Sequence, residues 1–165
     1  MIIIGIDPGT IVCGYGIIRM DGSSYTVIDY GCIRPPKGYK LSERYLVIFD
    51  GIDELLEKHH PDAVVVETQY VKKNVQSAIK LGMARGMVIL AAAKRVIPIY
   101  EYAPTKAKLA VVGSGRASKQ QVQGMVQRLL NLSCPPEPED AADALSLAIC
   151  HAQSTSKYNF IATEV

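Results

Sequence analysis

Four acidic residues stand where the sequence predicts that strands end or a helix begins: Asp7, Glu67, Asp140 and Asp143. Asp140 and Asp143 are three positions apart at a helix start, so they share one helix face, with Cβ atoms about 5–6 Å apart. Each acid alone could be a turn residue, a strand end or a helix cap. Together they exceed what capping needs, and an unpaired carboxylate among alanine and leucine neighbours is costly to bury.

Divalent metal would relieve that cost. Mg²⁺ takes hard oxygen ligands, typically a few carboxylates with water and substrate phosphate. Two such ions about 4 Å apart can clamp the attacking and leaving oxygens of a phosphodiester. The acids therefore predict phosphodiester hydrolysis at a site with two metal ions.

The elements that must position these acids follow from periodicity. We expect strands over 2–6, 12–19, 25–31, 62–67 and 96–102, the last placed at a sheet edge because of Pro98. We expect helices from Leu41 to His59, then over 74–95, 104–111 and 118–131, and a last helix carrying Asp140 and Asp143. This order predicts an α/β fold: a mixed five-stranded sheet, an antiparallel meander plus parallel strands, with helices on both faces.

Composition fits one globular domain. The chain has 165 residues, 48% hydrophobic and 21% charged. We expect a domain over residues 1–152 and a disordered tail over 153–165. No apolar run reaches the length of a membrane span and no signal peptide is evident, which favours a cytoplasmic protein without a membrane partner. The four cysteines show no CxxC pair and are expected to be reduced core thiols.

Positive charge is concentrated in one part of the chain. Residues 71–130 hold eleven basic residues and one acid, Glu101. The basic residues are Lys72, Lys73, Lys80, Arg85, Lys94, Arg95, Lys106, Lys108, Arg116, Lys119 and Arg128. Such asymmetry indicates either a positive face that meets a polyanion or a solvated surface with scattered lysines.

Four blocks together resemble the RuvC family of bacterial Holliday-junction resolvases: GIDPGTIVCGYG, VVVETQYVKKNVQSAIKLGMARG, VVGSGRASKQQV and EDAADALSLAI. The resemblance covers about residues 1–152. It implies an RNase H-like fold and a homodimeric endonuclease that nicks two opposed strands of a four-way junction with Mg²⁺ or Mn²⁺. It also implies work alongside the RuvA–RuvB branch-migration complex.

The resemblance assigns roles to particular residues. The family's acidic quartet falls on Asp7, Glu67, Asp140 and Asp143. Its junction-stacking aromatic falls on Tyr70, a tyrosine where the best-known members have phenylalanine. Its phosphate-handling lysines fall on Lys108 and Lys119.

From these assignments we predict a two-metal mechanism. Asp7 would bridge both metals, the other three acids would complete their coordination, and Lys119 would stabilise charge on the phosphate. The cut would leave 5′-phosphate and 3′-hydroxyl ends. Lys72, Lys73, Arg85 and Lys108 are the further expected DNA contacts.

The helix over 74–95 is a candidate subunit contact, because Ala78, Gly82 and Gly86 form a stripe of small residues beside Met83 and Met87. Ordinary packing on the sheet is the alternative. Three rival functions share parts of the pattern: an actin-like ATPase, a related nuclease of ribosomal RNA precursors, and a non-catalytic junction-binding protein. Metal-dependent paired nicks confined to a junction would separate the resolvase from all three.

Overall fold

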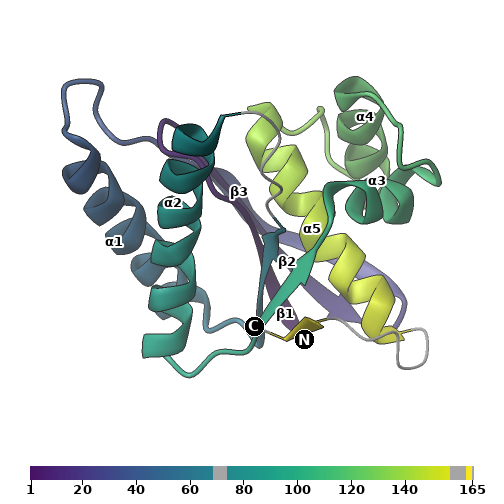
Figure 1. Ribbon diagram of the computed structural model, residues 1–165. Coiled ribbons are helices and arrows are strands. Elements are labelled where there is room, and N and C mark those ends of the chain that lie inside the picture. Colours follow the sequence, from purple (N-terminus) through teal and green to yellow (C-terminus); the bar gives the residue numbers. More distant parts are fainter. Residues whose placement is uncertain (69–73, 157–162, 165) are drawn as a thin grey trace.

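A mixed sheet lies between two groups of helices in the computed structural model, which describes residues 1–68, 74–156 and 163–164 (Figure 1). Strands β1 (Ile2–Asp7), β2 (Cys13–Asp21) and β3 (Ser24–Ile33) form an antiparallel meander. Strands β4 (Ala63–Glu67) and β5 (Ile99–Tyr102) extend the sheet parallel to β1. The strand order is β3-β2-β1-β4-β5-β6, where β6 (Thr163–Glu164) pairs antiparallel with β5. The predicted mixed sheet is confirmed, and β6 is an unpredicted addition.

Helices cover both faces of the sheet, as predicted. Helices α1 (Leu41–His59) and α2 (Val75–Lys94) lie on one side, and α3 (Pro104–Val112), α4 (Lys119–Leu129) and α5 (Glu139–Ser156) lie on the other (Figure 1). Each side has its own buried apolar cluster. Because successive strand residues point to opposite faces, Ile4 and Ile6 of β1 join the α1–α2 cluster, whereas Ile3 joins the α5 cluster.

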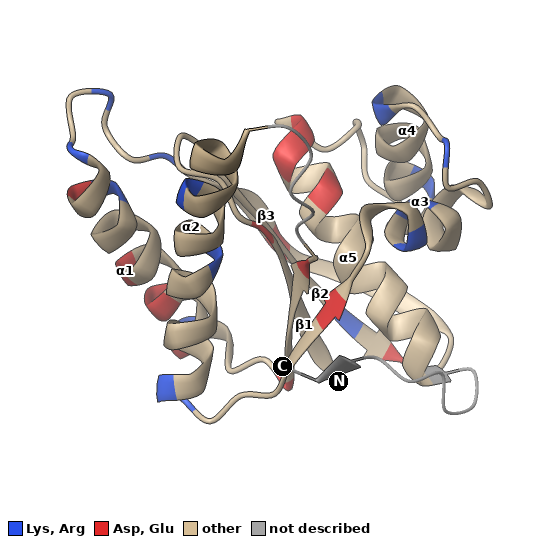
Figure 2. Ribbon diagram, viewed as in Figure 1, with Lys and Arg blue, Asp and Glu red and all other residues tan. Residues whose placement is uncertain are grey.

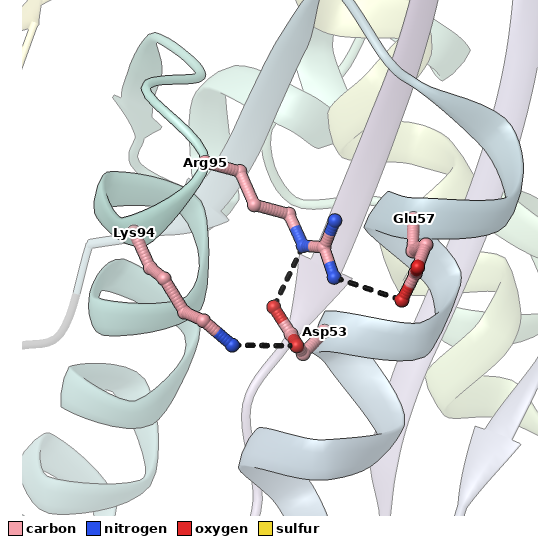
Figure 3. A network of polar contacts seen from close by, with 4 residues as sticks. All are labelled: Asp53, Glu57, Lys94 and Arg95. Carbon is pink, nitrogen blue, oxygen red and sulfur yellow. Dashed lines mark hydrogen bonds and ion pairs between the residues drawn. The ribbon is translucent and has the colours of Figure 1, made fainter.

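Ion pairs join α1 to the end of α2 (Figure 3). Asp53 of α1 accepts hydrogen bonds from Arg95 Nε at 2.7 Å and from Lys94 Nζ at 3.0 Å. Arg95 also donates to Glu57 Oε2 at 3.1 Å. The hydrogen bonds from Arg95 and Lys94 lower the pKa of Asp53 to about 2. Two residues of the basic span thus hold two helices together.

The structure differs from the sequence predictions at the edge of the sheet and at one cysteine. Strand β5 is not the outermost strand, because β6 pairs with its free side. Cys13 and Cys150 are buried, but Cys134 is exposed, so the prediction of a core thiol is wrong there. The cause is the proline-rich loop 133–138, which lies at the surface around it. The domain boundary after residue 152 stays a prediction, and α5 continues past it to Ser156.

Candidate active site and nucleic-acid interface

Strand alternation turns Asp7 and Glu67 toward α5. In β1, Ile3 packs in the α5 cluster, and Asp7 is four residues later on the same face. In β4, Val65 packs in that cluster, and Glu67 is two residues later. The strands are parallel neighbours, with Ile6 of β1 opposite Val66 of β4. The two acids therefore end adjacent strands on the face that α5 covers.

Glycines in the sheet let the backbone of α5 lie directly on it. A Cβ added at Gly5 would be 2.0 Å from the Ala144 carbonyl oxygen. A Cβ added at Gly14 would be 2.2 Å from the Asp140 carbonyl oxygen, and Gly14 is the cross-strand partner of Asp7. This close approach places the start of α5 beside Asp7. Sequence reasoning did not identify these residues, although a glycine inside a strand is a known sign of close backbone approach.

Asp7 is close enough to the other three predicted acids for their charges to influence its pKa. Burial, together with the neighbouring charges of Glu67, Asp143 and Asp140, raises the pKa of Asp7 to about 7, while Lys119 opposes this shift. Burial also raises the pKa of Asp143, against the lowering effect of Lys119. The cluster therefore carries more negative charge than its surroundings neutralise.

The donor chemistry of this cluster fits a hard divalent cation. Four carboxylates supply oxygen ligands, and their unbalanced charge is what a cation would compensate. Within the described ranges, no three Asp, Glu, His or Cys side chains are already arranged to hold one ion. Metal binding would therefore have to draw the carboxylates closer together.

Lysines from α3 and α4 border the acids. Figure 2 shows basic residues on these helices beside the acidic start of α5. Lys119 is the first residue of α4, after the N-cap Ser118, and its Nζ lies 2.8 Å from Glu139 Oε2. Lys108 Nζ donates to the Ala117 carbonyl oxygen at 3.2 Å. Sequence reasoning selected both lysines but did not identify Glu139. The sequence offered one sign of it, namely that this segment has more acids than the proposed site needs.

The remaining predicted DNA contacts divide into two groups. Arg85 forms an ion pair with Glu101 of β5, and its side chain is only 21% exposed. Tyr70, Lys72 and Lys73 lie outside the described residues. Sequence composition therefore overstated the unpaired positive charge, because it could not show which lysines and arginines already pair within the chain.

Helix α2 presents an apolar stripe to solvent. Ile79, Met83 and Leu90 are about half exposed. A Cβ at Gly82 or Gly86 would meet nothing within 4 Å, so this stripe does not pack on the sheet. By length and composition alone α2 could also span a membrane, although Lys80 and Arg85 interrupt its apolar residues, so the prediction that no apolar run has that length stands. The opposite side of α2 is buried in the α1–α2 cluster.

Comparisons with known proteins show which proteins this chain resembles in sequence and in structure. The family model described as "Crossover junction endodeoxyribonuclease RuvC" matches residues 3–151. RuvC of Protochlamydia amoebophila is 73% identical over 153 residues, covering 93% of this chain and 91% of that protein. The Thermus thermophilus RuvC structure superimposes with a TM-score of 0.89 at 32% identity, covering both chains fully. The T. thermophilus complex with a Holliday junction substrate gives 0.90 at 30% identity, again over both chains.

Proposed function

The chain belongs to the RuvC family of crossover junction endodeoxyribonucleases, and we propose that it cuts Holliday junctions at the carboxylate cluster of Asp7, Glu67, Asp140 and Asp143. The observation that carries this site assignment is the close approach of α5 to the sheet at Gly14, the cross-strand partner of Asp7, which brings Asp140 beside Asp7. The pKa of Asp7, raised to about 7 by burial and the three other acids, supports it. Such a concentration of buried negative charge is unfavourable for stability alone and marks a functional site.

The four carboxylates would hold divalent cations. Asp7 is the central ligand, because it interacts with all three other acids. The other proposed ligands are Glu67, at the end of β4, and Asp140 and Asp143, in the first turns of α5. Two bound Mg²⁺ ions, with Mn²⁺ as a substitute, would activate the attacking water and stabilise the departing 3′ oxygen. The products would carry 5′-phosphate and 3′-hydroxyl ends.

Lys119 and Lys108 would orient the DNA backbone over these acids. Lys119 stands at the first position of α4, where a cation is unfavourable to the helix dipole and α4 has no acid in its first turn. Helix stability therefore does not explain Lys119, whereas phosphate binding does. The hydrogen bond from Lys108 to Ala117 fixes the loop that leads to Lys119. Tyr70, Lys72, Lys73 and Arg85 remain proposed DNA contacts.

One assay tests the proposal. The protein is incubated with a four-way junction, a linear duplex, structured RNA and ATP, each with Mg²⁺ or with EDTA. Paired nicks confined to the junction and dependent on Mg²⁺ support the proposal. Asp7→Asn should abolish cutting and retain junction binding, because it removes a ligand and also a charge that repels phosphate. Cutting by Asp7→Asn at the wild-type rate would refute the assignment.

Symmetric nicks on two strands need two active sites related by a two-fold axis. The exposed stripe of α2 is the surface that we propose for this dimer, because its small residues permit close helix approach. Met83→Glu should convert the dimer to a monomer in sedimentation analysis. Leu109→Glu, which places the same charge on an exposed leucine of α3, is the matched control. A dimeric Met83→Glu variant would exclude this stripe.

The proposal also covers where the protein works and with which partners. A cytoplasmic enzyme working with the RuvA–RuvB complex is the setting that the family implies. Pull-down of RuvA and RuvB by the protein on a junction would test this partnership.

A further inference from the structure

A surface ion pair occupies the lysine that the proposed mechanism uses on the phosphate. Lys119 Nζ lies 2.8 Å from Glu139 Oε2, and the two side chains are 54% and 47% exposed. Lys119 also interacts with Asp143 and Asp140, but its hydrogen bond to Glu139 is the strongest influence on its pKa, which is raised. In the free protein, the ammonium group is therefore directed to a carboxylate outside the acidic quartet.

Glu139 pairs with Lys119 and also lines an open pocket. This pocket has a volume of about 610 Å³ and is lined by Arg34, Gln123, Glu137, Pro138 and Glu139. Pairing within the helix does not explain this contact, since Lys119 starts α4 and Glu139 starts α5. A DNA strand that approached the acids from this pocket would meet Glu139 next to the lysine.

A phosphate oxygen and a carboxylate oxygen are equivalent acceptors for a lysine ammonium group. The two anions repel each other, so a phosphate that binds Lys119 must compete with Glu139. We propose that Glu139 holds Lys119 in an inhibitory ion pair that the junction backbone displaces, so that Glu139 is a positioning residue that weakens DNA binding. This inference rests on the proposed phosphate-binding role of Lys119.

Junction binding measured in EDTA, where nothing is cut, tests the proposal. Glu139→Gln should bind the junction about two- to fivefold more tightly, the range expected when one exposed ion pair no longer has to be broken. Its plot of log Kd against log salt should be steeper than that of the wild type, because only the wild type must break an ion pair that salt itself weakens. Glu137→Gln, which removes a charge from the same pocket, is the matched control and should not steepen the slope.

Lys119→Ala separates this role from a structural one. Lys119→Ala and Glu139→Gln break the same ion pair, so a merely structural contact would change binding in the same direction in both variants. The proposal instead expects weaker binding for Lys119→Ala and tighter binding for Glu139→Gln. In the Lys119→Ala background, Glu139→Gln and Glu137→Gln should have equal effects.

Two results would overturn the inference: equal salt slopes for Glu139→Gln and Glu137→Gln, or a gain in binding from Glu139→Gln that still exceeds the gain from Glu137→Gln when Lys119 is absent. Failure of the proposed function is distinguishable. If the wild type does not cut the junction with Mg²⁺, the enzyme assignment fails. If Lys119→Ala binds and cuts like the wild type, the role of Lys119 fails, and the inference about Glu139 fails with it.

Discussion

Replacing Asp7 with asparagine should stabilise the metal-free protein at alkaline pH. The Asp7 carboxyl has a pKa of about 7 in the folded protein, against an ordinary value of 3.8, because it is buried beside three other acids. Below pH 3.8 the carboxyl is protonated in both folded and unfolded states and has no effect. Between pH 4 and 7 the unfolded state releases the proton that the folded state retains, so stability falls as pH rises.

The size of this effect follows from the pKa difference. A tenfold change in proton affinity corresponds to about 1.4 kcal/mol, so a rise from 3.8 to about 7 corresponds to about 4 kcal/mol above pH 7. This figure is an upper bound, because Asp7 retains some solvent contact. Asparagine has nearly the same shape and does not ionise. Asp7→Asn should therefore exceed the wild type in unfolding free energy by up to about 4 kcal/mol at pH 8.

Urea unfolding in EDTA at pH 4 and pH 8 measures the difference, because urea, unlike guanidinium chloride, does not screen charge. The gain of Asp7→Asn over the wild type should be largest at pH 8 and should shrink toward pH 4. Added Mg²⁺ should stabilise the wild type more than the variant, since ligand binding to the folded state raises its unfolding free energy. A variant no more stable than the wild type at pH 8, or one with the same gain at both pH values, would refute the reasoning.

Three further changes test the framework around the site. Gly14→Ala should abolish cutting and lower the free energy of unfolding by about 1–3 kcal/mol, because its Cβ would lie 2.2 Å from the Asp140 carbonyl oxygen. Junction cleavage and urea unfolding measure these two effects. The control variant Gly124→Ala, whose Cβ would meet nothing within 4 Å, should retain full cutting. Asp53→Asn should lower the unfolding free energy by about 0.5–1 kcal/mol at neutral pH. In the wild type, the pKa of the Asp53 carboxyl is lowered to about 2. The stability difference between wild type and variant should therefore disappear as pH falls from about 4 through 2. A difference that is unchanged at pH 2 would argue against the ion pairs. Val96→Gly should stabilise by about 1 kcal/mol, because Val96 has φ 57° and is 90% exposed; a lower thermal midpoint would contradict this.

The acids could be predicted from sequence because the elements that carry them have clear periodicity. The β-branched runs of β1 and β4 end at Asp7 and Glu67, and the three-residue spacing of Asp140 and Asp143 defines one helix face. Alternation within strands then decides which face of the sheet the first two acids share. These are local rules, and they apply before any tertiary contact forms.

What the sequence could not provide depends on distant contacts. Arg85 was a predicted DNA contact and Lys94 was one of the eleven basic residues counted in the span, but in the structure they pair with Glu101 and Asp53. The exposure of Cys134 and the pairing of β6 likewise depend on where a loop and a chain end lie. Charge counts alone therefore could not show that these two basic side chains already pair with acids of the same chain.

The proposed metal site requires the fold to hold four acids close together against their mutual repulsion. The helix that carries two of them lies on the sheet through backbone contacts at Gly5 and Gly14, where no side chain can yield. Buried apolar clusters on both sides of the sheet supply the free energy that opposes the charge repulsion. Backbone-to-backbone packing fixes the position of α5 more tightly than side-chain packing would, because a backbone cannot change rotamer. The site can therefore carry unfavourable charge without losing its alignment, and a single methyl group at Gly14 should damage catalysis more than the loss of any one basic residue on the surface.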